Sequence, residues 1–265
     1  MAIKTKKKIH EKNQKLTVHT KSLRLTTMCT LEKHGSLFIL TLIGDNHEHR
    51  LGPSLIDCLL SALSQVNSQA INGGSALITV AHGKFFCNGF DVPWGQSDAR
   101  SRLHQMVESF RSVMSALLSL PVPTIAAVSG HAAAGGLVLA LGHDYVLMRR
   151  DRGFLYMSEV DLAITLPDYV AALMRSKIGG SAARRDVLLR GMKVKGEEAV
   201  RMGIVDSAAY DSEESVVEAA VRLGHRLAER KWNGEVYAEI RKSLYPEICG
   251  VLGLVSKTIV ASSKL

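Results

Sequence analysis

Residues 124–141 constrain the fold of this chain more than any other segment. They begin with a run of β-branched and small apolar residues at 124–128. A small-residue run at 132–136 comes shortly after, and it leads directly into the apolar residues 137–141. This order predicts a buried strand, a tight turn and a buried helix with two glycines at its start.

The rest of the chain continues this alternation in its first half and loses it in the second. Apolar and β-branched runs predict strands over 36–44, 75–80, 124–128 and 144–148. Apolar residues at helical spacing predict helices over 53–69, 102–120, 169–178, 182–189, 197–202, 214–229 and 237–244. No tandem repeat is visible in the residue pattern. Alternating strands and helices, followed by helices alone, indicate an α/β fold with a helical carboxyl-terminal part.

The composition excludes several classes of protein. Hydrophobic residues make up 46% of the 265 residues, which is too many for a disordered chain. Because no stretch of eighteen uninterrupted apolar residues is present, we expect no membrane span. The cysteines are scattered without CxxC spacing, so we expect neither a zinc site nor a disulfide framework.

The net charge of +8 is concentrated in the first 27 residues. This segment holds eight basic side chains and one acid, Glu11, so it carries seven of the eight net positive charges. We interpret residues 1–27 as a solvated leader rather than an arm for nucleic acid, which is not an expected partner. Met28 could itself be a natural start. The nearly neutral remainder is expected to form the folded body.

The last three residues predict where the protein works. Ser263, Lys264 and Leu265 form a carboxyl-terminal tripeptide that the peroxisomal import receptor reads as an address. We therefore expect this receptor as a partner and the peroxisome as the location.

Two glycine-containing segments could present backbone N–H groups to a ligand. Residues 85–91 contain an Asn-Gly turn, and residues 130–136 place glycines at a predicted helix start. Neither segment matches a phosphate loop or a dinucleotide-binding pattern. For the first segment an ordinary turn remains open, and His131 in the second is more typical of a structural residue than of a catalyst.

A third candidate is Glu159, a carboxylate among apolar neighbours. It could face solvent at an edge. Alternatively it could lie in a dry pocket, where burial raises the pKa of a carboxyl group toward that of a working base. The residues alone leave both possibilities open.

These segments together resemble the crotonase (enoyl-CoA hydratase/isomerase) superfamily. The resemblance rests on the order FCNGFD, then PTIAAVSGHAAAGG, then Glu159, and it runs from about residue 36 to 206 and more loosely to 245. Within the superfamily the chain is most similar to the 3,2-trans-enoyl-CoA isomerases of plant peroxisomes. The resemblance implies a ββα spiral core over 28–205, a helical region over 206–262 used for trimer assembly, and the targeting tripeptide at 263–265.

The resemblance also implies residue roles. The backbone N–H groups of Phe90 and Gly135 would form an oxyanion hole for a thioester carbonyl, and Glu159 would be the base. The implied contacts with substrate and CoA are those of Arg50, Lys84, Asn88, Gly89, Asp91 and Gly136.

The number of carboxylates suggests the reaction. Hydratases of the superfamily carry a second glutamate where this chain has Val138, so the resemblance implies an isomerase with Glu159 as a single proton shuttle. It would convert 3-cis- or 3-trans-enoyl-CoA to 2-trans-enoyl-CoA in peroxisomal β-oxidation of unsaturated fatty acids. It would need no cofactor, because CoA is part of the substrate, and it would assemble as a homotrimer or hexamer.

Two alternatives remain at this stage. A dienoyl-CoA isomerase would use an additional aspartate, for which Asp168 is the candidate, although capping of the following helix is the simpler role. A non-catalytic homologue that binds acyl-CoA or RNA is the second alternative, motivated by the basic leader.

Overall fold

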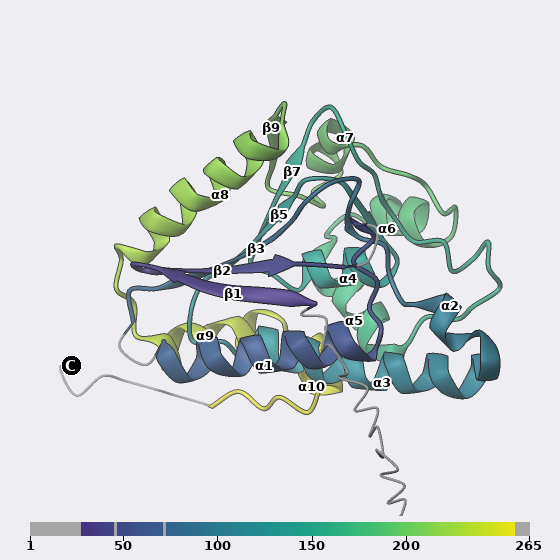
Figure 1. The fold of residues 1–265 in the computed structure, drawn as a ribbon, viewed down its shortest axis with the longest axis horizontal. Coiled ribbons are helices and arrows are strands. Elements are labelled where there is room, and N and C mark those ends of the chain that lie inside the picture. Colours follow the sequence, from purple (N-terminus) through teal and green to yellow (C-terminus); the bar gives the residue numbers. More distant parts are fainter. Residues whose placement is uncertain (1–27, 45–46, 71–72, 258–265) are drawn as a thin grey trace, which may run out of the picture.

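The computed structural model describes residues 28–44, 47–70 and 73–257. Its centre is a six-stranded sheet with the strand order β1-β2-β3-β5-β7-β9 (Figure 1). The strands are β1 (Cys29–His34), β2 (Leu37–Leu42), β3 (Ala76–Ala81), β5 (Thr124–Val128), β7 (Tyr145–Arg149) and β9 (Ser207–Tyr210). Only β1 and β2 pair antiparallel among these strands, and every other neighbouring pair is parallel.

A second, smaller sheet holds three short parallel strands. These are β4 (Phe85–Cys87), β6 (His131–Ala133) and β8 (Leu155–Tyr156), in that order. Each follows a strand of the large sheet and precedes a helix, so that a ββα unit occurs three times in succession along the chain. The sequence analysis predicted none of these three strands. Strands of two or three residues are too short to show an alternating pattern.

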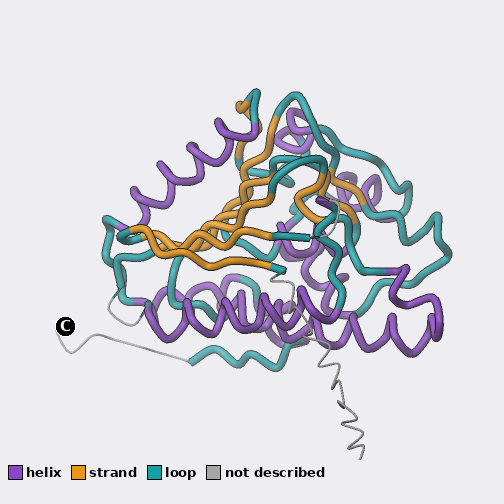
Figure 2. Tube along the Cα trace, in the orientation of Figure 1, coloured by secondary structure: helices purple, strands orange, loops and turns teal. Residues whose placement is uncertain are grey.

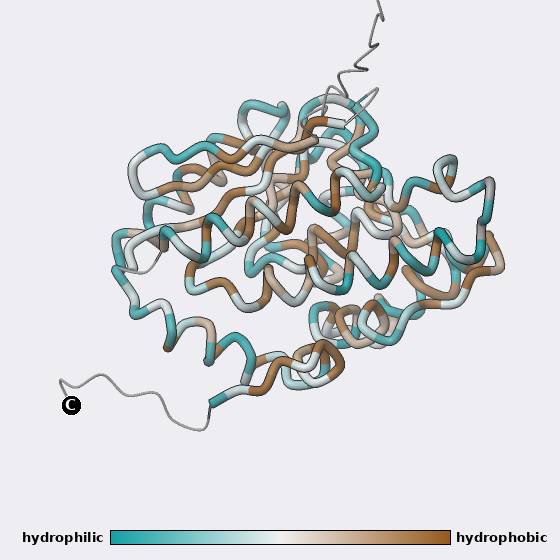
Figure 3. Tube along the Cα trace, turned by 60° about the horizontal axis from the view of Figure 1, so that its bottom comes forward, coloured by the Kyte–Doolittle hydropathy of each residue, from teal (hydrophilic) through white to brown (hydrophobic). Residues whose placement is uncertain are grey.

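The helices cover both faces of the large sheet (Figure 2). They are α1 (Pro53–Gln69), α2 (Val92–Gly95), α3 (Ala99–Leu118), α4 (Gly135–Leu141), α5 (Asp168–Lys177), α6 (Ser181–Leu188), α7 (Gly196–Arg201), α8 (Glu213–Ala228), α9 (Gly234–Leu244) and α10 (Pro246–Val251). Helix α8 covers one face, where Val216 and Ala220 pack with Ile78 and Ile125. Helices α1, α3 and α4 contribute to the larger core on the other face. In Figure 3 the helices alternate between hydrophobic and hydrophilic colours along their length, as expected for helices with one buried side.

Helix α4 is the exception to this amphipathic pattern, because all seven of its residues are buried. A helix that is apolar on every side belongs in the interior. The helix begins against β4: a Cβ atom on Gly136 would lie 2.1 Å from the carbonyl oxygen of Cys87. The glycine at this position therefore allows the helix start to touch the small sheet. The predicted strand, turn and buried helix over 124–141 are confirmed, with β6 formed inside the turn region.

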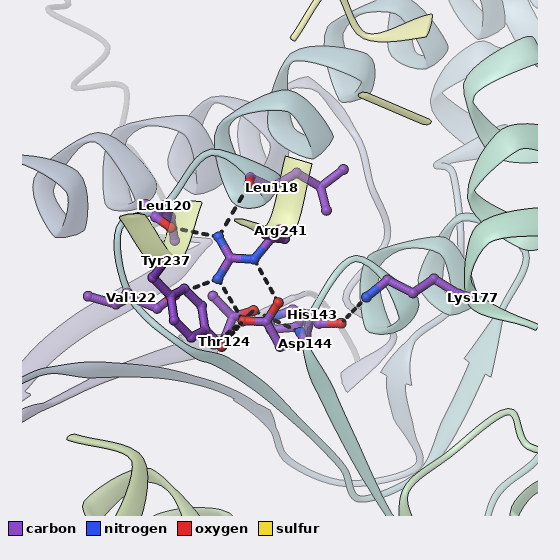
Figure 4. Close-up of polar contacts among 9 residues, drawn as sticks. All are labelled: Leu118, Leu120, Val122, Thr124, His143, Asp144, Lys177, Tyr237 and Arg241. Atoms are coloured by element: carbon purple, nitrogen blue, oxygen red, sulfur yellow. Dashed lines mark hydrogen bonds and ion pairs between the residues drawn. The ribbon is translucent and has the colours of Figure 1, made fainter. Parts of the chain in front are cut away.

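The carboxyl-terminal helices α9 and α10 fold back onto the body, where they contact α3 and α5. Arg241 of α9 is buried and donates to the carbonyl oxygens of Leu120 and Val122, at 2.6 Å each, and to both carboxylate oxygens of Asp144 (Figure 4). Asp144 also accepts from the backbone N–H of Thr124 at 2.9 Å. This network ties α9 to the ends of β5 and β7.

Most helix predictions agree with the structure to within about three residues at each end. The prediction over 53–69 coincides with α1, whereas α2 and α10 and the strands β1 and β9 were not predicted. None of the helices in the described ranges has the length and hydrophobicity needed to cross a membrane. The predicted leader at 1–27 and the tripeptide at 263–265 lie outside the described residues.

Candidate active site

Two backbone segments that are far apart in sequence meet beside α4. The first contains Gly89 and Phe90 and is fixed by the N–H of Leu51, which donates to the carbonyl oxygen of Gly89 at 2.8 Å. The second is the turn before α4. A Cβ atom on Gly89 would lie 3.0 Å from the carbonyl oxygen of Ala133, and one on Gly135 would lie 3.4 Å from the Phe90 ring. The two segments are therefore in direct contact.

The turn before α4 holds its backbone in a strained conformation. Ala134 has a φ of 48° and a ψ of −119°, which a residue with a side chain adopts rarely. Its N–H donates to the carbonyl oxygen of Tyr156 at 2.9 Å, and its own carbonyl oxygen accepts from Leu137 and Val138. Within the described part of the chain, no backbone hydrogen bond uses the N–H of Phe90 or Gly135. These two donors are available to a ligand.

A cavity of about 250 Å³ opens next to these segments. Its walls come from the loops after β2 and β4, from α2 and α3, from β6 and the turn after it, and from β8 and the loop after it. The lining residues are Arg50, Asn88, Phe90, Val92, Leu103, Val107, Ala133, Ala134, Tyr156, Ser158, Glu159, Leu162, Ile164, Thr165 and Pro167. Most of the wall is apolar, so a charged group in it is poorly solvated.

Glu159 contributes a carboxylate to this wall. Its Oε2 atom is buried and has no hydrogen-bond partner among the described residues. Burial raises the pKa of this carboxyl group, while the backbone amides of Glu159 and Ser158 act in the opposite direction. Of the two possibilities that the sequence left open, the structure supports the dry pocket.

The loop that carries Glu159 is fixed by its own backbone. The N–H of Ile164 donates to the carbonyl oxygen of Glu159 at 2.9 Å, and the N–H of Leu162 donates to that of Ser158 at 3.1 Å. The apolar side chains of Leu162 and Ile164 both line the cavity with the carboxylate. The loop therefore presents a positioned carboxylate with apolar neighbours.

The predicted substrate and CoA contacts divide into two groups. Arg50 and Asn88 line the cavity, and the Arg50 Nε donates to the Glu48 carboxylate at 2.5 Å. Lys84 is exposed and lies outside the cavity wall, with its ammonium 5.3 Å from the centre of the Phe85 ring. Asp91 accepts from the backbone N–H of Trp94 at 3.3 Å and so caps α2.

The glycines at positions 89, 135 and 136 act through the backbone: they let the two segments and α4 approach closely without forming the cavity wall. The contacts of these residues with CoA stay predictions.

Three other side chains that the sequence singled out do not line the cavity. Val138 is buried inside α4. His131 stacks on the Phe154 ring, and burial lowers its pKa, as expected of a structural histidine. Asp168 is exposed and accepts from Arg111 at 2.6 Å, so its carboxylate is held in an ion pair outside the cavity wall.

The sequence analysis missed several residues of the cavity wall. Leu103 and Val107 were recognised only as part of a helix stripe, and Tyr156 and Ser158 were not singled out. An alternating pattern through β8 and the residues after it could have indicated that Tyr156 and Ser158 share one face. The strand itself has only two residues, Leu155 and Tyr156, which is too few to show such a pattern. Within the described ranges no cluster of histidine, cysteine or acidic side chains is arranged to hold a metal ion.

The arrangement joins two backbone donors, one partly desolvated carboxylate and an apolar cavity. Two donors aimed at one oxygen stabilise negative charge that develops on it. A carboxylate with a raised pKa can accept and return a proton near neutral pH. These are the parts needed for proton transfer next to an activated carbonyl group.

The family model for enoyl-CoA hydratase/isomerase matches residues 32–245. The chain therefore belongs to the enoyl-CoA hydratase/isomerase family, the crotonases, as the sequence motifs had suggested.

Curated relatives from Arabidopsis thaliana are similar over nearly the whole chain. Enoyl-CoA delta isomerase 2, peroxisomal, is 64% identical over 90% of this chain and 100% of its own length. Enoyl-CoA delta isomerase 3 is 60% identical over 88% of this chain and 98% of its own length. Enoyl-CoA delta isomerase 1, peroxisomal, is 51% identical over 83% of this chain and 91% of its own length.

Solved structures share the fold at much lower identity. A probable enoyl-CoA hydratase from Mycobacterium tuberculosis has a TM-score of 0.77 at 21% identity, with 85% of this chain and 92% of that chain covered. An enoyl-CoA hydratase from Mycobacterium marinum has a TM-score of 0.75 at 19% identity, with 85% and 95% covered. These likenesses confirm the predicted α/β crotonase fold and carry no information on the reaction.

Proposed function

We propose that this protein is an enoyl-CoA delta isomerase that converts 3-cis- or 3-trans-enoyl-CoA to 2-trans-enoyl-CoA. The observation that carries the proposal is Glu159, a single carboxylate in an apolar cavity beside two free backbone donors. The names of the Arabidopsis relatives, which are 51% to 64% identical, support the same reaction.

The proposed mechanism begins with the thioester oxygen. The N–H groups of Phe90 and Gly135 donate to this oxygen and stabilise the enolate that forms when carbon 2 loses a proton. Each such donor contributes about 3 kcal/mol to lowering the barrier. Glu159 accepts the proton from carbon 2 and returns it to carbon 4, so the double bond moves and no atom is gained or lost.

The surroundings of Glu159 suit this role. Burial raises the pKa of its carboxyl group, which strengthens the carboxylate as a base. Hydration would need a second acid or base to position a water molecule, and the position of that group in the hydratases is occupied by buried Val138. The reaction needs no metal or redox cofactor, because CoA arrives with the substrate.

The remaining parts of the proposal concern binding, location and assembly. Arg50, Asn88 and the exposed Lys84 would contact the CoA portion near the cavity mouth. The tripeptide 263–265 would engage the peroxisomal import receptor, and two of the Arabidopsis relatives carry the word peroxisomal in their names. The carboxyl-terminal helices α9 and α10 would support a homotrimer or hexamer.

The test is Glu159→Gln in the full chain, with turnover of 3-enoyl-CoA followed by the ultraviolet absorbance of the conjugated product. We expect a loss of at least about 10³-fold in kcat, with acyl-CoA binding retained, since the base contributes to the transition state. Asp161→Asn is the matched control, because Asp161 is an exposed acid on the same loop that does not line the cavity. Near-native turnover of the Gln variant would refute the role of Glu159.

A further inference from the structure

Hydrogen bonds on both sides of Phe90 connect its segment to the loop 47–52, which precedes α1. The backbone carbonyl oxygens of this loop accept from the N–H of Asn88 at 2.9 Å and from the N–H of Asp91 at 3.4 Å. In the opposite direction, the N–H of Leu51 donates to the same segment at 2.8 Å. The Phe90 N–H, which is the proposed oxyanion donor, lies between these bonds. The loop 47–52 therefore determines where this N–H points.

The loop 47–52 does not hold its own shape. Residues 48–52 lie in neither a helix nor a strand. His47 and His49 have φ values of 55° and 49°, in the left-handed region that residues with a side chain adopt uncommonly. Strained backbone of this kind persists only where surrounding contacts hold it. The loop therefore needs an anchor outside its own backbone.

The side chain of His49 supplies such an anchor. It is 1% exposed, and its Nδ1 donates to the carbonyl oxygen of Phe85 at 3.0 Å. Burial lowers the pKa of the imidazole, so the ring is neutral near pH 7. A Cβ atom on Gly44 would lie 2.5 Å from the Cα atom of His49. His49 is thus fixed between Gly44, which follows β2, and the first residue of β4.

His49 and the loop backbone attach to the same stretch of chain at two points. The imidazole binds at Phe85, where β4 begins, and the backbone hydrogen bonds of the loop lie beyond the end of β4. Loss of the imidazole hydrogen bond would release the first point and leave the second attached only to a strained loop. The Phe90 N–H would then move relative to the thioester oxygen.

The second oxyanion donor has a separate support. Gly135 begins α4, and the N–H of Ala134 in the turn before it donates to the carbonyl oxygen of Tyr156 at 2.9 Å. The His49 ring bonds to β4 and not to this turn. A change at His49 should therefore displace one donor and leave the other in place.

We propose that His49 is a positioning residue of the active site: its hydrogen bond to the Phe85 carbonyl oxygen holds the loop 47–52 and, through this loop, aims the Phe90 N–H at the thioester oxygen. The proposal rests on the isomerase function and adds a residue that supports the oxyanion hole from outside the cavity wall. His49 itself does not line the cavity.

Three substitutions in the full-length protein separate the hydrogen bond from the backbone conformation. His49→Leu removes the donor. His49→Gly also removes the donor, but it adopts a positive φ without strain. His49→Asn keeps an N–H donor near the position of Nδ1 and tolerates a positive φ. We expect kcat for 3-trans-hexenoyl-CoA to fall about 10²-fold in the Leu and Gly variants with KM within about threefold, and to stay within about fivefold of the wild type in the Asn variant.

The absorbance of bound 2-trans,4-trans-hexadienoyl-CoA reports on the two donors directly. Hydrogen bonds to its carbonyl oxygen polarise the conjugated system and move its near-ultraviolet absorbance to longer wavelength. With one of two donors displaced, His49→Leu and His49→Gly should lose about half of the wavelength shift seen with the wild type, and His49→Asn should keep it. A role in stability alone would not change this wavelength shift.

His143→Leu is the matched control, because His143 is also a buried histidine whose Nδ1 donates to a backbone carbonyl oxygen, that of Leu139, at 2.9 Å. Its other ring nitrogen bonds to Thr79, so the ring is not tied to the loop 47–52. Urea denaturation should show a loss of stability in the Leu variants of both histidines. The control should nevertheless keep kcat within about threefold of the wild type and the full wavelength shift.

Wild-type kcat in His49→Leu or His49→Gly would overturn the proposal. An unchanged wavelength shift in both variants would overturn it as well, and so would a loss of kcat in His49→Asn or in the control as large as that in His49→Leu. Absence of turnover of 3-trans-hexenoyl-CoA by the wild type would instead refute the isomerase function, and the wavelength shift would still test the position of the Phe90 N–H.

Discussion

Gly136→Ala tests whether the contact between β4 and α4 sets the geometry of the two backbone donors. A Cβ atom at this position would lie 2.1 Å from the carbonyl oxygen of Cys87 and 2.9 Å from its Cβ. Atoms in real contacts at Cβ keep at least 3.0 Å, so the backbone of β4 and the start of α4 must separate by about 1 Å. Neither side can yield by a side-chain rotation, because the nearest atoms belong to the backbone.

This displacement acts on both donors of the oxyanion hole. Gly135 precedes Gly136 at the start of α4, and Phe90 follows β4 by three residues. A shift of about 1 Å between reacting groups costs on the order of 10²-fold in rate. Overpacking of a well-filled core costs about 1–3 kcal/mol in the free energy of unfolding. We therefore expect a folded, less stable protein whose kcat falls about 10²-fold.

The assay is the isomerisation of 3-trans-hexenoyl-CoA, with unfolding followed by circular dichroism on the same samples. Gly179→Ala is the control, because a Cβ atom there would meet no atom within 4 Å and the backbone has no positive φ. The control should keep wild-type kcat and stability within about twofold and about 0.5 kcal/mol. A Gly136→Ala variant with wild-type kcat would show that the reasoning about the donors is wrong.

Three further predictions concern charged groups. Because burial raises the pKa of Glu159 above its ordinary value of 4.5, kcat/KM should rise with pH through a pKa above 4.5, and a profile flat from pH 4 to pH 8 would contradict this. Burial acts to raise the pKa of Asp144, but the Arg241 guanidinium outweighs burial and lowers this pKa below its ordinary value of 3.8. The ion pair therefore stabilises the fold at pH values above 3.8, and this stabilisation is lost as the pH falls through the lowered pKa. Arg241→Met should cost about 3–5 kcal/mol of unfolding free energy near neutral pH, as measured by urea denaturation, with the difference shrinking toward acid. Asp168→Asn should change the turnover of 3-enoyl-CoA less than about twofold, because the carboxylate pairs with Arg111 outside the cavity wall. A strong loss of turnover confined to 3,5-dienoyl-CoA would favour the dienoyl-CoA isomerase instead.

The repeated architecture shows a limit of sequence reading. The three ββα units have different residue patterns, so no repeat was visible in the sequence. What they share is topology: β3, β5 and β7 of the large sheet are each followed by a short strand of the small sheet. Two or three residues of strand carry too little pattern to be recognised, and their pairing comes from other segments of the chain.

Part of the candidate site could be predicted from the sequence, and part of it could not. Backbone donors can be anticipated from glycines at a strand–helix junction, since few residue types permit such close approach. The side chains of the cavity wall cannot be anticipated in this way. Leu103 and Tyr156 belong to elements whose residue patterns indicate that a side chain is buried but not which cavity it lines. For Asp91 the sequence motif suggested a contact with substrate or CoA. In the structure its carboxylate caps α2.

The sequence by itself determined the α/β class, the buried helix after the glycines, the positions of the two donor segments and Glu159 as the candidate base. The class, the helix and the donor segments follow from local patterns of apolar and small residues, whereas the role of Glu159 came from the family resemblance. Only the tertiary structure decided that Glu159 lies in an apolar cavity and that Asp168 is held by Arg111. The reason is physical: desolvation and pairing of a charge depend on atoms brought close by the fold, and residues next to each other in sequence do not specify those atoms.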